Sequence, residues 1–308
     1  MKKLISGVLA CLLIAGSVTA LSAEERAADA ITVSSPNGAP AVALALLAEK
    51  QPENYTYVAA ETIAAEFAQG KADVIIAPIN AGAKLFKVGK SSYQLAAVVT
   101  WGNLYFASQK KNFKIKDIKK SGVTLFGENT INASIALFSL SKNGIEPKSV
   151  AYLAGAAQTQ SLLLTDKNAV VVTAEPALTA AKMKNPAITA YPLNELYKKA
   201  SGFDGYAQAG LFVKKETASE KEGALKAFLS QAEKAVNAAA SDTGAVAKAA
   251  VALEILPNVK IAESAIPNCN LRYVPAKEAR KAIEATALVD VQQFGGALPA
   301  DDFYYAAE

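Results

Sequence analysis

The residues whose types and positions suit binding chemistry are polar side chains beside two short apolar strands. Residues 71–78 read KADVIIAP and residues 168–176 read NAVVVTAEP, and each stretch follows an apolar, helix-like run. Asn80 comes soon after the first stretch, and Glu175 stands just before the proline that ends the second. In doubly wound sheets, ligands bind outside the carboxyl ends of the strands. The near-repeat therefore predicts two similar α/β lobes, with Asn80 and Glu175 on facing sides of a binding cleft.

Glu175 has two expected roles, and the sequence leaves both open. Its carboxylate can contact a cationic or N–H-bearing ligand, or it can pair with a lysine across the hinge between the lobes. A sulfonate or nitrate site should offer anion donors and few carboxylates. Glu175 therefore favours a pyrimidine, an amine or a cation, with Asn80 as a neutral partner on the other lobe.

The sequence contains no histidine, and this limits the chemistry that the chain can perform. Histidine is the commonest general base at neutral pH and a member of the Ser-His-Asp and Cys-His arrangements. The usual zinc sites need histidine or several cysteines, whereas Cys269 is the only cysteine beyond Cys11. No GxxxxGK[ST] or GxGxxG loop occurs. We therefore expect binding without catalysis, with no catalytic residue, no cofactor and no metal, and Cys269 packed as a small apolar residue.

A turn before the first expected helix offers further candidates: Ser34, Ser35, Asn37 and Gly38. The helix should begin near Pro40, which suits the first position of a helix. Free backbone N–H groups and the helix dipole at such a site suit a carboxylate, a sulfonate or a ring carbonyl. The alternative is a plain turn, because Pro-Asn-Gly favours turns in any context.

Two other strand or helix ends should reach the same cleft. Thr130 and Asn132 stand at the matching helix start of the second lobe, where either could instead cap the helix. Thr100 and Trp101 end a strand of the first lobe, so the Trp101 ring could stack on a heteroaromatic ligand; the alternative is a core or hinge residue. Arg272 is a weaker candidate, for which a structural ion pair is expected.

The order of expected elements predicts an α/β protein with parallel sheets. Besides the two repeat strands, the expected strands cover residues 31–34, 55–59, 95–100, 123–126, 150–153 and 207–213. The expected helices cover residues 40–50, 61–69, 133–143, 177–183, 221–240, 244–253 and 276–288, and residues 295–305 are expected to form a loop.

We expect two lobes, since a chain of 308 residues favours about two domains. The first lobe is discontinuous and covers residues 31–106 plus 208–308, while the second covers residues 107–207. The strand at residues 207–213 should return the chain to the first lobe. Two connections between lobes would form a two-strand hinge.

The first residues predict a secretion signal. Lys2 and Lys3 precede a short apolar run, and small residues allow cleavage after Ala23, giving a signal peptide at residues 1–23 and a periplasmic protein. A lipid anchor through Cys11 is the alternative. The formal net charge is +4, and the basic run at residues 109–120 should form a solvated face, so we expect no nucleic-acid partner.

Several motifs, taken together in their order, resemble those of a known family. They are Gly70–Val74 (GKADV), Val99–Gly102 (VTWG), Ala174–Ala177 (AEPA) and the ending Leu298–Tyr305 (LPADDFYY). The sequence resembles type II periplasmic solute-binding proteins of ABC importers, in the branch that includes receptors for alkanesulfonates, taurine, nitrate and thiamine pyrimidines. The resemblance extends from about Ile31 to the end of the chain.

The resemblance implies a function as well as a fold. Two lobes should close on a small-molecule solute, pyrimidine-like or sulfonate-like, and deliver it to an ABC permease in the inner membrane. The protein should act as a monomer. A periplasmic enzyme or a sensor input domain on the same fold is the alternative, although one enzymatic relative depends on histidine and a cytosolic one does not fit a signal peptide.

Overall fold

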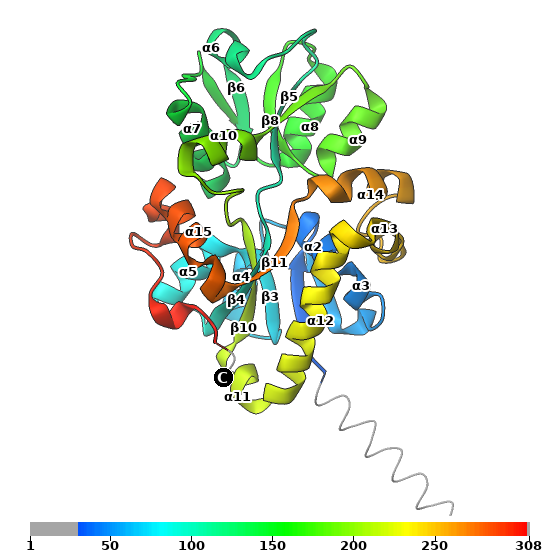
Figure 1. Cartoon of the computed structure of the whole chain (residues 1–308), viewed down its shortest axis with the longest axis vertical. Helices are drawn as coiled ribbons and strands as arrows, with labels where there is room; N and C mark the ends of the chain where they lie inside the picture. Colours follow the sequence, from blue (N-terminus) through cyan, green and yellow to red (C-terminus); the bar gives the residue numbers. More distant parts are fainter. Residues whose placement is uncertain (1–29, 307–308) are drawn as a thin grey trace, which may run out of the picture.

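The computed structural model describes residues 30–306, so the expected signal peptide and Cys11 lie outside the described residues. The chain forms two β-sheets that lie one above the other in Figure 1. The lower, six-stranded sheet has the order β11-β4-β10-β3-β1-β2, with strands at Val33–Pro36 (β1), Tyr55–Val58 (β2), Val74–Pro78 (β3), Tyr93–Thr100 (β4), Ala209–Lys214 (β10) and Leu271–Pro275 (β11). The upper, five-stranded sheet has the order β7-β6-β8-β5-β9, with strands at Leu104–Ser108 (β5), Val123–Phe126 (β6), Val150–Leu153 (β7), Val170–Ala174 (β8) and Thr189–Pro192 (β9).

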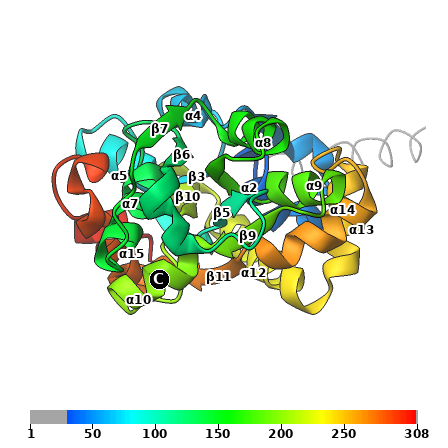
Figure 2. The same ribbon diagram turned by 90° about the horizontal axis from the view of Figure 1, so that it is seen from above.

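Helices cover both faces of each sheet. Around the lower sheet lie helices at Ala39–Ala43 (α2), Ala45–Ala48 (α3), Ile63–Gln69 (α4), Ile79–Lys87 (α5), Lys215–Glu220 (α11), Glu222–Ser241 (α12), Thr243–Ala252 (α13), Val259–Ala265 (α14) and Ala276–Val289 (α15). The upper sheet carries helices at Ile118–Ser121 (α6), Ile131–Lys142 (α7), Ala156–Thr165 (α8), Ala177–Lys184 (α9) and Leu193–Ser201 (α10). Figure 2 shows α8 and α9 on one side of that sheet and α7 and α10 on the other. None of the helices within residues 30–306 is long and apolar enough to span a membrane.

Strand β3 explains why each sheet needs helices on both faces. Ile75 and Ala77 belong to one apolar core cluster, while Val74 and Ile76 belong to another. Successive side chains of a strand point to opposite faces, so a strand without polar positions must be covered on both sides. The same reason explains the three successive valines that begin β8, and both repeat strands are central in their sheets.

The near-repeat folds as expected, as two helix–strand–helix units. The first unit is α4–β3–α5 and the second is α8–β8–α9. Gly70 ends α4 with φ of 62°, a left-handed conformation that glycine adopts at little cost. Helix α5, directly after Pro78, was not expected from the sequence. The residues after this proline were expected to form a loop at the end of the strand.

The other expected strands are all present, with ends shifted by at most two residues. The expected helix at residues 40–50 is instead interrupted at Leu44, which separates α2 from α3. The tail expected as a loop contains a short turn of 3-10 helix at Asp301–Phe303, and Tyr304 bridges to Leu95 at the start of β4. Strands β5, β9 and β11 and helices α10 and α14 were not expected.

Both sheets are mixed, which corrects the expectation of parallel sheets. Strand β10 lies between β3 and β4 and is antiparallel to both, and β5 is antiparallel to β8 and β9. Both β5 and β10 follow a segment that crosses from one sheet to the other. The chain therefore enters the new sheet at the edge where the parallel strands end, and it must run against them.

The two crossing segments lie side by side. Residues 101–103 join β4 to β5, and residues 206–208 lead into β10. Gln208 N donates a hydrogen bond to Thr100 O at 3.1 Å, and Asn103 N donates one to Gln208 Oε1 at 3.1 Å. The lobe boundary expected after residue 106 falls inside β5, which pairs along its length with β8. We propose that the second lobe begins at residue 104 and ends near residue 207.

Candidate functional site

A cavity of about 470 Å³ lies between the two sheets, where the carboxyl ends of their parallel strands face each other. Its walls come mainly from the residues that follow β1, β2, β3 and β4 in the lower sheet and β6, β7 and β8 in the upper sheet. Most of the residues that the sequence singled out line it: Asn37, Gly38, Asn80, Thr100, Thr130, Asn132 and Glu175. The tertiary structure thus brings together residues that are far apart in the chain.

Ser34 and Ser35 do not line this cavity. Both are buried inside β1, at 1% and 2% exposure, and Ser35 Oγ donates a hydrogen bond to Pro36 O at 3.2 Å. The strand extends two residues further than expected, to Pro36, so the turn that reaches the cavity begins only after these two serines.

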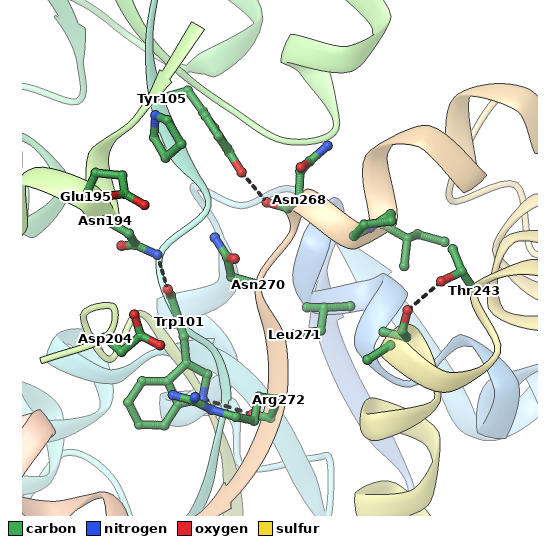
Figure 3. A pocket seen from close by; sticks show the side chains of 15 residues that line it. Trp101, Tyr105, Asn194, Glu195, Asp204, Thr243, Asn268, Asn270, Leu271 and Arg272 are labelled. Atoms are coloured by element: carbon green, nitrogen blue, oxygen red, sulfur yellow. Dashed lines mark hydrogen bonds between the residues drawn. The ribbon is translucent and has the colours of Figure 1, made fainter. Parts of the chain in front are cut away.

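Trp101 lies in a different place from the one expected. It lines a second cavity of about 660 Å³ that shares none of its described lining residues with the first (Figure 3). The indole N–H donates to Arg272 O at 2.9 Å, and the Arg272 guanidinium lies 4.5 Å from the centre of the ring. Trp101 is 6% exposed, so its ring packs against β11 as a core and hinge residue.

The neighbouring residues of the same crossing segment explain the difference. Successive side chains of a strand point to opposite sides, so Thr100 and Trp101 at the end of β4 line different cavities. Gly102, with φ of 75°, turns the chain after them, and Asn103 lines the cavity between the sheets as Thr100 does. Thr100 Oγ1 also accepts a hydrogen bond from Ala209 N at 2.9 Å, which ties the two crossing segments together.

Three asparagine side chains give the cavity its polar character. The carboxamide oxygens of Asn80, Asn103 and Asn132 are buried and have no hydrogen-bond partner among the described residues. Asn103 is 6% exposed, and its Nδ2 donates to Glu175 O at 3.0 Å. A buried acceptor without a partner costs about 1–3 kcal/mol.

Asn103 was not among the residues chosen from the sequence. It comes directly after Trp101 and Gly102, where a strand was expected to end, so its position was the available signal. Gln208 and Gln293 also line the cavity and were not expected. Gln208 lies at the start of an expected strand, whereas candidates were sought where strands end, and Gln293 lies beyond the last expected helix.

Glu175 lines the cavity and makes no ion pair with a lysine among the described residues; its carboxylate bonds instead to the helix that follows it. Glu175 is 4% exposed. Its two carboxylate oxygens accept hydrogen bonds from Thr179 N at 3.1 Å and from Thr179 Oγ1 at 2.9 Å. Burial raises the pKa of Glu175, and this effect outweighs the hydrogen bonds from Thr179 and the attraction of Lys182. The carboxylate therefore satisfies the first turn of α9, the helix that follows it.

Thr130 also fulfils a structural role at the cavity wall. Its Oγ1 accepts from Ala133 N at 3.5 Å, which caps α7, and donates to Gly127 O at 2.6 Å. Asn132 does not cap α7, and its carboxamide oxygen has no hydrogen-bond partner among the described residues.

The charged residues that line the cavity are all acidic. Within residues 30–306, no lysine or arginine lines it, and its charged lining residues are the carboxylates of Glu61 and Glu175. Glu61 is exposed and lies opposite Gly155 of the upper lobe. Helices α5, α7, α8 and α9 begin at the wall, so their first backbone N–H groups supply donors there. No group of three or more His, Cys, Asp or Glu side chains in the described part of the chain could hold a metal ion.

Further contacts hold the lobes against each other. Gln293 Nε2 donates to Asn129 O at 2.8 Å, and Ser134 Oγ donates to Asp290 Oδ2 at 2.7 Å. On the side of the second cavity, Tyr105 O–H donates to Asn268 O at 2.8 Å (Figure 3). Cys269, next to Asn268, is fully buried, as expected for a small apolar residue, and burial raises the pKa of its thiol.

Comparison with solved structures identifies the fold. An ABC transporter from Parabacteroides distasonis matches 90% of this chain and 99% of its own, with 21% identity and a TM-score of 0.78. The ligand-binding component of an ABC-type import system from Staphylococcus aureus, with zinc bound, matches 90% of this chain and 96% of its own, with 10% identity and a TM-score of 0.69. The alkanesulfonate-binding protein SsuA from Xanthomonas axonopodis pv. citri, bound to MOPS, matches 89% of this chain and 97% of its own, with 14% identity and a TM-score of 0.66.

These likenesses define the class of fold: the chain has the two-lobed α/β fold of type II periplasmic binding proteins, with a cleft between the lobes and a two-strand hinge. The resemblance expected from the sequence is thus confirmed at the level of the fold. No family model matches the sequence, and no curated protein matches it.

Proposed function

We propose that this protein is the extracytoplasmic substrate-binding component of an ABC importer. It captures a small organic solute between its lobes and delivers the solute to a permease in the inner membrane. The observation that carries the proposal is the cavity of about 470 Å³ at the facing strand ends of a periplasmic-binding-protein fold. Cavities of this size suit small-molecule ligands.

The chemistry of the chain supports binding without catalysis. The sequence contains no histidine, and Glu175, the buried carboxylate of the cavity wall, holds the start of α9 and so serves the structure. In this proposal the first 23 residues direct export to the periplasm, and the mature protein acts as a monomer without a nucleic-acid partner. The solute is either pyrimidine-like or sulfonate-like.

Thermal unfolding with a panel of small solutes tests the proposal. A ligand present at about 100 times its dissociation constant should add about 2.7 kcal/mol to the free energy of unfolding. The panel should contain pyrimidines, flavins, sulfonates and nitrate. A folded protein whose unfolding temperature does not change with any small solute would contradict a receptor function, while turnover of a bound solute would favour an enzyme.

A further inference from the structure

We propose that the end of the upper lobe that lies away from the cavity between the sheets is an electrostatic docking surface for an anionic phospholipid membrane. Seven exposed lysines form this surface, which we call the lysine face: Lys111, Lys114, Lys116, Lys119, Lys120, Lys148 and Lys167. The inference goes beyond the proposed function, because it concerns a different surface and does not depend on the solute.

The positive charge of the protein is concentrated in the upper lobe. Residues 104–207 contain 13 lysines and 7 acidic residues, which gives a formal charge of +6. The described residues of the lower lobe, 30–103 and 208–306, contain 16 lysines and arginines and 17 acidic residues, which gives a formal charge of −1. Such a charge asymmetry between two parts of a chain is typical of proteins that bind a charged surface.

Three segments of the upper lobe bring the lysines together. Lys148 N donates a hydrogen bond to Ile118 O at 3.2 Å, and Ser108 Oγ donates one to Ala169 O at 2.6 Å. These bonds make neighbours of segments that are far apart in the chain. Each segment lies directly before a parallel strand: residues 109–122 before β6, residues 146–149 before β7 and residues 166–169 before β8.

The lysine face lies opposite the cavity. The carboxyl ends of β6, β7 and β8 reach the cavity between the sheets, so the segments that precede these strands lie at the other edge of the upper sheet. Figure 1 shows α6, which belongs to the first segment, at the end of the upper lobe farthest from the lower sheet. A membrane bound to the lysine face therefore leaves the cavity accessible to a solute.

The apolar residues of the first segment explain why its lysines are exposed. Ile118 is fully buried in the core, and Phe113 and Ile115 pack against the same core cluster. The lysines that stand between and after these residues consequently project into solvent. Burial of the apolar residues thus fixes a rigid array of positive charges at the surface.

The acidic side chains of the three segments do not neutralise the lysines. Asp117, Glu146 and Asp166 each accept a hydrogen bond at 2.8 Å from a backbone N–H or a hydroxyl group at most five residues away. Among the ion pairs within residues 30–306, none involves a lysine of the lysine face. Its seven positive charges are therefore available to a partner.

The side-chain chemistry favours a membrane over a protein or a nucleic acid. Residues 104–207 contain no arginine, the residue that pairs bidentately with carboxylate and phosphate groups. Lysine is a strongly hydrated point charge, and it is depleted in protein–protein interfaces. The ring of Phe113, the aromatic residue of the three segments, packs against the core and is not placed to stack on bases. A layer of anionic headgroups attracts lysines without a fitted contact.

Sedimentation of the mature chain with lipid vesicles tests the inference. The vesicles consist of phosphatidylcholine alone or of phosphatidylcholine with phosphatidylglycerol, at salt concentrations of about 0.05 M and about 0.5 M. We expect the protein to bind the vesicles that contain phosphatidylglycerol at the lower salt concentration. It should not bind at the higher concentration, where charges are screened, and it should not bind uncharged vesicles.

Two matched triple variants test the position of the surface. Each lysine near an anionic membrane strengthens binding about fivefold, so replacing Lys114, Lys116 and Lys119 together by Gln should weaken vesicle binding about a hundredfold. The control replaces three exposed lysines of the lower lobe by Gln and changes the net charge by the same amount: Lys234, Lys248 and Lys260. The control should bind within about twofold of the parent protein. Replacing the first three lysines by Arg should preserve binding.

The outcomes separate the inference from the proposed function. If the folded parent protein does not bind vesicles that contain phosphatidylglycerol, the inference is wrong, while the solute panel still decides the receptor function. Equal weakening by the two triple variants would also overturn the inference, because net charge alone would then govern binding. Tighter binding of poly-glutamate or of DNA than of the vesicles would replace the membrane by an acidic protein or a nucleic acid, and the inference would again be wrong.

Discussion

In the first copy of the near-repeat, α4–β3–α5, the acidic residue Asp73 precedes the strand, whereas in the second copy, α8–β8–α9, Glu175 follows it. Asp73 joins distant parts of the lower lobe, because its carboxylate accepts from Thr32 N, Thr32 Oγ1, Thr217 Oγ1 and Lys221 Nζ at 2.7–3.2 Å. Among residues 30–306, the Glu175 carboxylate accepts only from Thr179, four residues along the same segment.

The two carboxyl groups therefore differ in pKa. Burial raises the pKa of Asp73, but the hydrogen bonds from Thr32, Thr217 and Lys221 outweigh it, so the pKa lies below the usual value. Burial also raises the pKa of Glu175, and there the hydrogen bonds from Thr179 are too few to reverse it. The comparison shows that both acidic residues hold neighbouring segments in place, Asp73 across the lower lobe and Glu175 at the start of α9.

The largest expected effect belongs to Asp73→Ala. The variant leaves several donors without their acceptor, including the ammonium of Lys221, so the free energy of unfolding should fall by about 2–3 kcal/mol in urea denaturation. Asp204→Ala is the control, because Asp204 also pairs with a lysine, Lys198, but both side chains are exposed. If the free energy of unfolding fell as little as in the control, the structural role of Asp73 would be contradicted.

Glu175→Ala should have a smaller effect, about 1 kcal/mol. The variant removes the acceptor for the first turn of α9 but also removes a buried charge, and these two changes oppose each other. Glu175→Gln keeps an acceptor and should preserve both stability and affinity for the solute. If Glu175→Gln abolished solute binding while the protein stayed folded, the carboxylate would be a ligand contact after all.

Asn80→Ala should lower the affinity for the solute but leave the free energy of unfolding unchanged. Its oxygen has no partner in residues 30–306, so the apo protein loses no hydrogen bond and should unfold at an unchanged urea concentration. Affinity for the solute should fall by about 1 kcal/mol, measured by calorimetric titration. A loss of stability with unchanged affinity would place Asn80 with Asp73 and Glu175 as a structural residue.

The smallest expected effect is on the pH dependence of stability, and its sign differs between the two carboxyl groups. Because the folded-state pKa of Asp73 is lowered from 3.8, its contribution is present above pH 3.8 and is lost as the pH falls through the folded-state pKa. Because the folded-state pKa of Glu175 is raised from 4.5, the free energy of unfolding decreases as the pH rises above 4.5.

Unfolding experiments with Asp73→Asn and Glu175→Gln between pH 3 and pH 8 would separate the two contributions. Each variant, subtracted from the parent protein, should give a difference curve with the slope of the group that it lacks, rising with pH for Asp73 and falling with pH for Glu175. Curves with the same slope would contradict the opposite pKa shifts.

Periodicity and strand ends predicted the architecture because these signals are local. The apolar runs of β3 and β8, Gly70 at the end of α4 and Gly144 after α7 each depend on a few neighbouring residues. Strands β5 and β9 were missed because the positions of their neighbours in the sheet, rather than their own residues, distinguish them from loops. The reversed direction of β5 and β10 follows from the path of the chain between the sheets.

The candidate site was predicted in part for the same reason. Asn80, Thr100 and Asn132 line the cavity because strand ends and helix starts of this fold must meet there. Ser34 does not line the cavity because β1 extends to Pro36, and Trp101 does not line it because the direction of a side chain depends on the exact register of its strand. A shift of one residue moves a side chain to the other face.

The sequence by itself determined that this protein has two similar α/β lobes, that it lacks histidine chemistry and that the polar ends of its strands should meet. Only the tertiary structure decided which polar groups remain for a ligand. The Asp73 carboxylate accepts hydrogen bonds from distant residues. Glu175 and Thr130 form hydrogen bonds with residues close to them in the chain. The oxygens of Asn80, Asn103 and Asn132 have no partner among the described residues. That distinction depends on distances in space, and spacing along the chain does not contain it.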